Sequence, residues 1–319
     1  LLGVGTFILS PKFFVGLEAA FQNVEYVEFV SHLNSFCNDA KDISAFELHG
    51  EYININDRDS LNLANFYERN ALYDKSCISL LIYCEGFEED VAFAIRRYKT
   101  LDVIDNFYLI LPYKNGIEPI LNGLEIQIIK CPEEINQYGE MQKYALEHAQ
   151  GDILILSDAD YSFPNRDIPK LLTYLREADM VIGTRTTRQL IAQGSNMKGI
   201  VRLANIQLAK LLEILWWNFE GRFTDTQCIF RAIWKQSFDL IKSDLNCKGG
   251  EFGTEMIIEL LQKRRRIIEI PVNYQNRPGS AFRKYQNVRT YFSILFLILR
   301  RKARQMLAPK KLVPEPPPR

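Results

Sequence analysis

The stretch Gly151-Asp152-Ile-Leu-Ile-Leu-Ser157-Asp158-Ala-Asp160 decides the fold of this chain. Its apolar core, Asp152–Leu156, predicts a short strand that is buried on both faces, because it carries no alternation of apolar and polar residues. Two carboxylates, one residue apart, follow the strand directly. The stretch therefore predicts a central strand that delivers Asp158 and Asp160 to its carboxyl end.

Alternating strands and helices surround this stretch from residue 76 onward. The other predicted strands are Cys77–Tyr83, Phe107–Leu111, Glu125–Lys130, Met180–Gly183 and Ile267–Tyr274. The predicted helices are Glu88–Tyr98, Tyr138–Ala149, Asp167–Arg176, Lys198–Trp217 and Glu255–Arg265. Apolar strands separated by helices predict an α/β fold with a parallel sheet covered on both faces. Ligands of such sheets bind beyond the carboxyl ends of the strands.

Two carboxylates at that edge suit a hard divalent cation. Asp158 and Asp160 offer oxygen ligands for Mg²⁺ or Mn²⁺, which leave further positions for phosphate oxygens and water. The pattern Asp-x-Asp alone is weak, and a second copy, Asp57-Arg58-Asp59, is interpreted as a helix cap. Capping of the next helix is also the structural alternative for Asp158 and Asp160.

The charge of the chain is divided unevenly, although Lys+Arg and Asp+Glu both number 39. Residues 263–304 hold twelve basic residues and one acid, Glu269. This basic segment contains the apolar run Tyr291–Leu299, which is too short to cross a bilayer of about 30 Å. A basic amphipathic helix over residues 283–307 is predicted, either lying at a membrane surface or docked on the domain or on a second subunit.

Cysteine usage points to a reducing compartment. The six cysteines form no C-x-x-C pair and there are three histidines, which argues against a zinc site and a disulfide framework. No signal peptide is recognised, and no nucleic-acid partner is expected. The chain starts with Leu-Leu in mid-pattern, so we expect a fragment. Residues 308–319, rich in Pro and Lys, are predicted to be a disordered tail.

Residues 1–70 are predicted to be a separate small α/β unit. The expected elements are a strand Val4–Leu9, helices Val27–Asn38 and Ser60–Tyr67, and a strand within Ala45–Asn56. Asn56-Asp57 is expected to cap the helix that follows.

Six motifs occur in a fixed order along residues 76–290. They are Gly151–Pro164, Gly183-Thr184-Arg185, Arg202 with Asn205, Asp225–Arg231, Glu255 ahead of Ile268-Glu-Ile-Pro271, and Arg277-Pro-Gly-Ser280. Together they resemble glycosyltransferase family 2, especially the branch that makes polyprenyl- and dolichyl-phosphate sugars. The resemblance implies a GT-A (Rossmann-like) domain at 76–282, with a mixed, mostly parallel sheet flanked by helices.

The resemblance also implies roles for single residues. Asp158 and Asp160 would hold the metal and the diphosphate of a nucleotide-sugar, and Asp225 would be the catalytic base or a group that orients the acceptor. Donor or acceptor phosphates would be bound by Arg185, Arg202, Arg231, Arg277 and Ser280. The implied reaction is one in-line displacement with inversion at the anomeric carbon. A phosphate acceptor needs little base catalysis, since its second pKa is about 6.

The nucleoside pocket departs from the family pattern. By position it would contain Tyr83, Glu85, Tyr113 and Asp158, but the turns Tyr83–Phe87, Pro112–Gly116 and Asn136–Glu140 lack the family's usual residues. The missing acid after the second strand would normally bind the nucleotide base or ribose.

A second resemblance covers the N-terminal residues. Gly3–Pro11 and Gly50–Leu61 resemble the C-terminal end of a sugar-phosphate nucleotidyltransferase domain, without its glycine-rich start. We hypothesise that the full-length protein coupled donor synthesis to transfer.

Three interpretations remain open at the level of sequence. The first is a polyprenyl-phosphate glycosyltransferase, peripheral on the cytoplasmic inner face of a membrane. The second is a soluble glycosyltransferase with a glycan, alcohol or polyol-phosphate acceptor. The third is a catalytically impaired nucleotide-binding or scaffold protein. A homo-oligomer is compatible with each.

Overall fold

The computed structural model describes residues 53–84, 88–113, 123–192, 199–217, 221–275 and 288–307. The chain divides into two compact units, Leu1–Ala64 and Asn65–Arg319. The second unit contains the sheet and every helix after α3, the helix Arg58–Tyr73 that crosses the boundary. The elements expected at Val4–Leu9 and Val27–Asn38, and the tail 308–319, lie outside the described residues.

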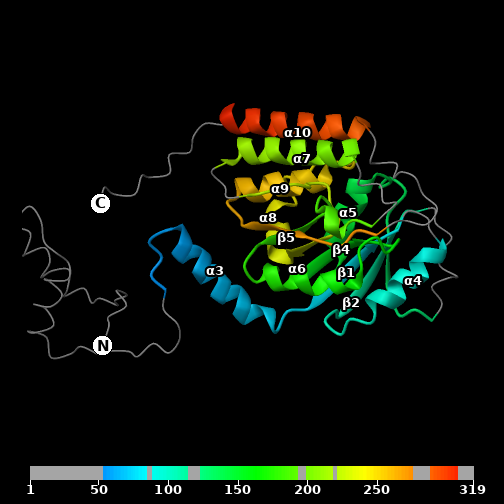
Figure 1. Cartoon of the computed structure of the whole chain (residues 1–319). Coiled ribbons are helices and arrows are strands. Elements are labelled where there is room, and N and C mark those ends of the chain that lie inside the picture. The colour runs from blue at the N-terminus through cyan, green and yellow to red at the C-terminus, as the bar shows by residue number, and fades with distance from the viewer. Residues whose placement is uncertain are drawn as a thin grey trace, which may run out of the picture. The chain divides into compact units, whose positions relative to one another are not determined.

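A single seven-stranded sheet forms the centre of the second unit (Figure 1). Its strands are β1 (Ile78–Tyr83), β2 (Asn106–Leu111), β3 (Gln127–Lys130), β4 (Ile153–Asp158), β5 (Met180–Thr184), β6 (Arg231–Trp234) and β7 (Ile267–Pro271). They lie in the order β3-β2-β1-β4-β6-β5-β7. Only β6 runs antiparallel to its neighbours, so β4 and β5 point the same way on either side of it. The predicted mixed, mostly parallel sheet flanked by helices is confirmed.

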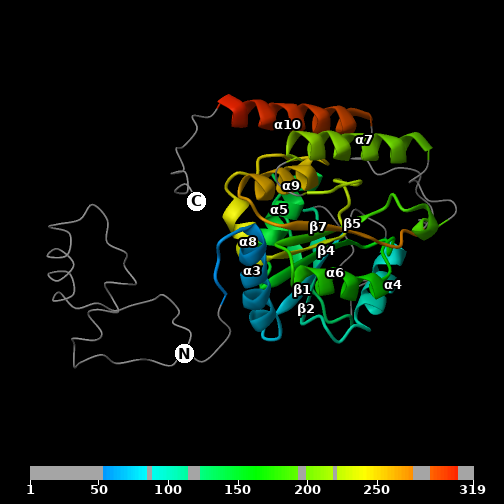
Figure 2. The same ribbon diagram turned by 60° about the vertical axis from the view of Figure 1, so that its left-hand side comes forward.

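Helices cover the sheet in layers. The helices of the second unit are α4 (Glu88–Tyr98), α5 (Tyr138–His148), α6 (Ile168–Leu175), α7 (Gly199–Leu215), α8 (Lys235–Ile241), α9 (Phe252–Gln262) and α10 (Val288–Leu307), with short 3₁₀ turns at Asn165–Asp167 and Arg188–Leu190. Helices α4 and α6 lie on one face of the sheet, and α5 and α9 lie on the other (Figures 1 and 2). Helices α7 and α10 lie side by side beyond α9.

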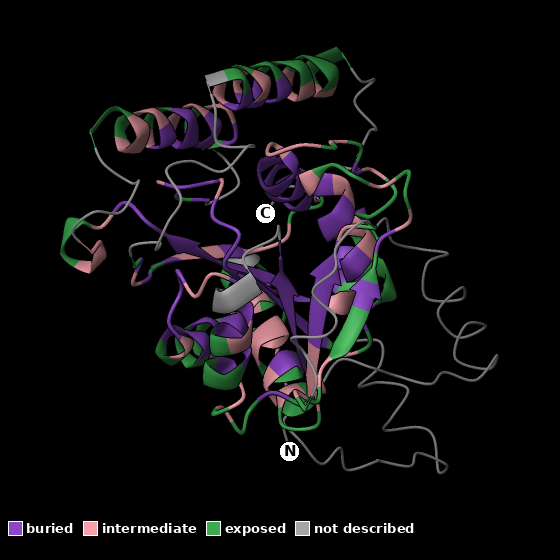
Figure 3. Ribbon diagram, turned by 90° about the vertical axis from the view of Figure 1, so that its right-hand side faces the viewer, coloured by how far each residue is buried: buried purple, intermediate pink, exposed green. Residues whose placement is uncertain are grey.

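The core follows the apolar pattern of the sequence. Every residue of β1 and β4 is buried, as expected for strands that are covered on both faces (Figure 3). Helix α6 buries Ile168, Leu171, Leu172 and Leu175, which the 3.6-residue helical period places on one face. Pro169 lies in its first turn, where a missing N–H costs no helical hydrogen bond.

The sequence missed two elements of the sheet region. Strand β6 and helix α8 follow the Asp225–Arg231 motif directly, and β6 has only four residues. The strand expected within Ala45–Asn56 is described only from residue 53, and residues 53–56 form no strand. The other strands and helices predicted between residues 57 and 275 are confirmed, with ends that shift by up to three residues, except that α3 ends six residues later than the predicted helix Ser60–Tyr67.

The capping role predicted for Asp57 is confirmed. Its carboxylate oxygen Oδ1 accepts a hydrogen bond from the backbone N–H of Ser60 at 2.7 Å, at the start of α3. The side chain is therefore used to satisfy a first-turn N–H.

Ion pairs link helix α10 to helix α9. Arg301 of α10 forms ion pairs with Glu255 and with Glu259, the latter at 3.0 Å, and donates to the carbonyl oxygen of Asp244 at 2.9 Å. No helix among the described residues is both long and apolar enough to cross a membrane.

The buried carboxylate of Glu259 makes stability depend on pH. Burial raises the pKa of Glu259 from 4.5 to about 7, against the opposing effect of Arg301. The folded protein therefore holds a proton that the unfolded chain releases, and its stability falls as the pH rises from about 4.5 to about 7. In Glu259→Gln this fall is absent, so the stability of the variant relative to wild type should rise by about 1–3 kcal/mol between pH 5 and pH 8.

Urea unfolding at several pH values measures this difference. The exposed carboxylate of Glu177, replaced in Glu177→Gln, is the matched control and should show no such trend. A difference between Glu259→Gln and wild type that stays constant with pH would contradict the assignment.

Candidate active site

Asp158 is the last residue of β4, and its side chain is buried at the carboxyl end of the strand. The register pairs it with Tyr83, the last residue of β1, and the N–H of Ala159 donates to the carbonyl oxygen of Tyr83 at 2.8 Å. The turn that follows β4 is therefore fixed to the end of the neighbouring strand. This is the edge of the sheet where ligands of α/β proteins bind.

Side-chain contacts hold the turn after Asp158 in one conformation. Asp160 accepts hydrogen bonds from the N–H and the hydroxyl of Ser162, at 3.0 and 2.7 Å. Tyr161 has a φ of 53°, a left-handed conformation that is uncommon for a residue with a bulky side chain. Strained backbone of this kind persists only where the surroundings fix it, and it is frequent at functional sites.

Tyr98 of α4 holds the same turn through two hydrogen bonds. Its hydroxyl donates to the carbonyl oxygen of Phe163 at 2.8 Å and is hydrogen-bonded to the hydroxyl of Ser157 at 2.8 Å. Burial raises the pKa of this hydroxyl well above 10. Tyr98 thus stays protonated and ties both sides of the turn to one helix.

The two carboxylates are chemically suited to a hard divalent cation. Among the described residues, no group of three or more His, Cys, Asp or Glu side chains is placed to hold a metal ion by itself. Asp158 and Asp160 supply two hard oxygen donors, and Ser162 fixes the second carboxylate. One or two protein carboxylates, completed by phosphate oxygens and water, is the usual set for Mg²⁺.

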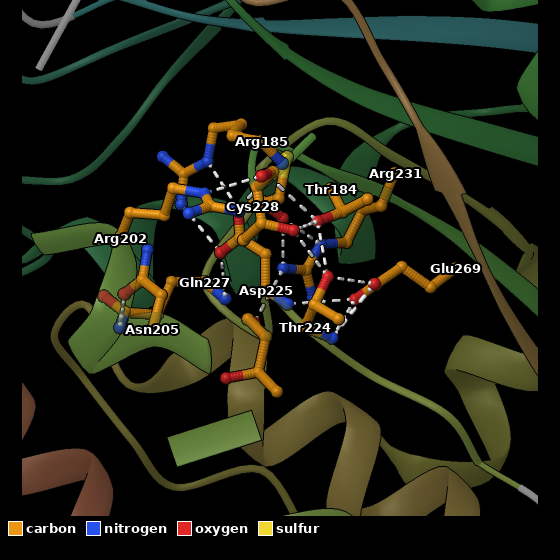
Figure 4. Close-up of polar contacts among 12 residues, drawn as sticks. Thr184, Arg185, Arg202, Asn205, Thr224, Asp225, Gln227, Cys228, Arg231 and Glu269 are labelled. Atoms are coloured by element: carbon orange, nitrogen blue, oxygen red, sulfur yellow. Dashed lines mark hydrogen bonds and ion pairs between the residues drawn. The ribbon is translucent and has the colours of Figure 1, made fainter. Parts of the chain in front are cut away.

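A second cluster surrounds an ion pair that is shut off from water (Figure 4). Arg185 follows β5 directly, and its Nε and Nη2 donate to the two oxygens of Asp225 at 2.7 and 2.9 Å. The side chains are only 4% and 0% exposed. Burial lowers the pKa of Arg185, but the charge of Asp225 more than offsets this, so the guanidinium stays charged.

Other polar side chains extend this cluster. Arg202 of α7 donates through Nε to the carbonyl oxygen of Thr186 at 2.7 Å, and Gln227 donates to the side chain of Asn205 at 2.8 Å. Tyr291 of α10 is close enough for Arg185 and Asp225 to act on its hydroxyl, whose pKa is raised mainly by burial.

Topology brings the two clusters to the same edge of the sheet. Asp158 ends β4 and Arg185 follows the parallel strand β5, while Asp225 precedes β6, which runs the other way. The ring of Tyr274 lies 5.4 Å from that of Phe163 and 5.6 Å from the Arg185 guanidinium carbon. Gln275 donates to the carbonyl oxygen of Ser162 at 2.9 Å. The segment after β7 therefore contacts both clusters.

The other sequence candidates are placed differently. Arg231 is buried in β6, and its guanidinium donates to the backbone carbonyl oxygens of Cys228 and Gly253. Tyr83 packs edge-on against Tyr138 with 4.9 Å between ring centroids, and Tyr113 follows β2 with its side chain exposed. Glu85, Arg277 and Ser280 lie outside the described residues.

Sequence reasoning missed Glu269 of β7. Its carboxylate accepts hydrogen bonds from the backbone N–H groups of Thr224, at 2.8 and 2.9 Å, and of Asp225, at 3.0 Å. Its position in the motif Ile268-Glu-Ile-Pro271, as the only acid in a basic segment, was the available signal.

Residues 114–229 match glycosyl transferase family 2. This stretch of the chain is similar to family 2 glycosyltransferases. The matched stretch includes Asp158, Asp160, Arg185 and Asp225, which the fold has just been shown to gather at one edge of the sheet. The sequence-based resemblance to this family is confirmed.

Curated relatives are similar to this chain over the same region. The low-salt glycan biosynthesis hexosyltransferase Agl6 of Haloferax volcanii is 30% identical over 146 residues, which cover 45% of this chain and 34% of the relative. The dolichyl-phosphate beta-glucosyltransferase of Saccharomyces cerevisiae is 25% identical over 169 residues, half of each chain. This chain thus spans half or less of the length of these two relatives.

Solved structures support the GT-A fold prediction for the family 2 domain. The glucosyl-3-phosphoglycerate synthase of Mycobacterium tuberculosis, solved with Mn²⁺, uridine diphosphate and phosphoglyceric acid, has a TM-score of 0.56. It is 14% identical, and the match covers 74% of this chain and 82% of that one. At this identity the likeness establishes the shared fold alone.

The support of the acidic turn by Tyr98 can be tested with Tyr98→Phe. The change leaves the carbonyl oxygen of Phe163 without its buried donor and should lower the free energy of unfolding by about 1–2 kcal/mol. Chemical denaturation measures the loss. Tyr174→Phe, which removes the hydroxyl of an exposed tyrosine, is the control and should have no measurable effect. Equal stabilities of the two variants would contradict this role of Tyr98.

Proposed function

We propose that this domain transfers a sugar from a nucleotide-sugar to a polyprenyl phosphate, with inversion at the anomeric carbon. The observation that carries the choice of acceptor is the state of Asp225. Both of its carboxylate oxygens accept hydrogen bonds from Arg185, and the side chain is fully buried. Such a carboxylate orients an arginine well but is poorly placed to take a proton from a hydroxyl acceptor.

A phosphate acceptor removes the need for a base. Its second pKa is about 6, so it attacks as a dianion at neutral pH. In this proposal Arg202 binds phosphate oxygens, since the guanidinium fork matches them in geometry. The buried Arg185–Asp225 pair holds the segment that carries Thr186, which Arg202 contacts. The matched relative from yeast, by its name, acts on dolichyl phosphate.

In this proposal Asp158 and Asp160 would hold a Mg²⁺ or Mn²⁺ ion at the donor site. The metal would supply Lewis-acid stabilisation of the charge that develops on the leaving nucleoside diphosphate. Ser162 and Tyr98 keep the two carboxylates in place before the donor arrives, so no reorganisation is needed on binding.

Two adjacent helices offer a surface for the membrane that contains such an acceptor. Exposed apolar side chains recur on one face of each helix; we call this set the apolar face, and it consists of Ile200, Leu203, Ile214 and Trp217 at α7, and Phe292, Phe296, Leu299, Met306 and Leu307 on α10. The exposed Arg289, Arg300 and Arg304 flank it on α10. Apolar side chains beside cationic ones suit the headgroup region of an anionic bilayer. The proposed location is therefore peripheral, on the inner face of a membrane.

A soluble phosphate-bearing acceptor is the second candidate. The structural neighbour from Mycobacterium tuberculosis was solved with phosphoglyceric acid, which is a small phosphate-bearing acid. This candidate keeps the same roles for Arg185 and Arg202 but gives the apolar face no part in acceptor delivery.

Donor binding is predicted to depend on a metal and on the acidic turn. Calorimetric titration with UDP, GDP, CDP and dTDP should show one nucleotide that binds with Mn²⁺ and not without it. Asp158→Asn/Asp160→Asn should weaken this binding by about 100-fold or more, because both metal ligands lose their charge. The second Asp-x-Asp copy supplies the control, and Asp57→Asn/Asp59→Asn should bind as wild type does. Failure of folded wild type to bind any nucleotide would contradict a donor site here.

Membrane docking is predicted to depend on the apolar face. Wild type should sediment with vesicles that contain anionic phospholipid. Phe292→Ser/Phe296→Ser should lose about tenfold or more of this affinity, since two exposed aromatic side chains that would enter the bilayer are lost. Val103→Ser changes an exposed apolar residue of the loop before β2 and serves as the control. Wild type that stays in the supernatant would favour the soluble acceptor.

A further inference from the structure

Glu269 lies at the edge of the cluster around Asp225, where it accepts hydrogen bonds from the turn that carries Asp225 (Figure 4). Its two oxygens accept three backbone contacts from the N–H groups of Thr224 and Asp225, and a fourth contact, of 2.5 Å, from the hydroxyl of Thr224. Strand β7 thereby holds the turn that carries Asp225, across a sequence distance of more than forty residues.

The backbone around Asp225 is fixed from both sides. Glu269 binds the N–H of Asp225 at 3.0 Å, and the N–H of Gln227 points back to the Asp225 oxygen Oδ1 at 3.3 Å. The Asp225 carboxylate then has one direction in which to face, and Arg185 lies there. Without Glu269, two backbone donors next to Asp225 would lose their acceptor.

The network continues to the second arginine of the site. The hydroxyl of Thr224 is hydrogen-bonded to those of Thr184 and Thr186, at 2.8 and 2.7 Å. Thr186 accepts the Nε–H of Arg202 through its carbonyl oxygen. Glu269 is thus linked through Thr224 to the backbone position that orients Arg202.

Burying the Glu269 carboxylate costs free energy. This cost argues that its two acceptor oxygens are needed at this position. Burial raises the pKa of Glu269, and the nearby charge of Asp225 adds to the rise, while the donors on Thr224 and Asp225 lower it. Among the described residues, no cationic side chain pairs with Glu269 to compensate its charge. A glutamine would offer one acceptor oxygen and would direct its NH₂ group toward a backbone donor.

We propose that Glu269 is a positioning residue for the sugar transfer, which sets the orientation of Asp225 and through it the orientation of Arg185. This inference rests on the proposed function for its effect on rate, but the geometric claim stands by itself. Glu269 touches neither acceptor nor donor in this proposal and acts only through the Thr224–Gln227 turn.

Glu269→Gln tests the proposal, with Ser237→Ala as the matched control. Ser237 likewise takes part in a buried hydrogen bond, which it donates to Asp179 at 2.9 Å, and it has no contact with the site. The first readout is the exchange rate of the Arg185 Nε–H with solvent, measured by ¹⁵N NMR, which needs no activity. We expect exchange to accelerate about tenfold or more in Glu269→Gln and to stay unchanged in Ser237→Ala, because exchange reports local opening.

The second readout is a double-mutant cycle on transfer. Glu269→Gln should lower kcat by about 10- to 100-fold while the Kd for the nucleotide stays as in wild type, as expected for a misplaced group. In an Asp225→Asn background the same change should cost less than about twofold, because the two residues act as one unit.

Two results would overturn the proposal. One is unchanged protection of the Arg185 Nε–H in folded Glu269→Gln. The other is an equal loss of kcat in both backgrounds, which would mark a general structural effect. Wild type without any transfer activity would count against the proposed function instead, and the exchange measurement would still decide the role of Glu269.

Discussion

The buried ion pair between Arg185 and Asp225 is the contact that most constrains this site. Arg185 and Asp225 come from segments about forty residues apart, and leaving either one alone in the interior would cost about 3–5 kcal/mol. The chain therefore has to bring the end of β5 and the approach to β6 together. The pair is shut off from water, and two hydrogen bonds from Arg185 to Asp225 hold its geometry.

The sheet order makes this meeting possible. Because β6 runs antiparallel between β4 and β5, its amino end lies at the same edge as their carboxyl ends. One edge then holds an acidic turn that suits a cation and a guanidinium cluster that suits phosphate. The family 2 match, residues 114–229, includes both the acidic turn and this cluster.

The apolar periodicity and the order of the motifs were enough to predict most strands and the binding edge of the sheet. Apolar runs located β1, β2, β4 and β5, and the position of Asp158 after a buried run located the binding edge. Strand β6 was missed because four residues next to a motif give no usable period. The hydrogen-bond partners of side chains could not be predicted from the sequence. No local sequence pattern indicates that Arg231 binds backbone carbonyls, or that Arg185 donates to both oxygens of Asp225. Glu269 was visible as an isolated acid, but the groups that it binds lie in a turn more than forty residues earlier.

The position of β6 has a consequence for the order in which the protein is made. Strand β4 consists of six buried residues, and one of its edges is closed only by a strand that leaves the ribosome more than seventy residues later. During that interval an apolar strand with open backbone donors and acceptors is exposed to other nascent chains. Slower synthesis of residues 159–230 would lengthen the interval, so the yield of folded protein in a cell should depend on codon choice in this stretch and on chaperones that cover β4.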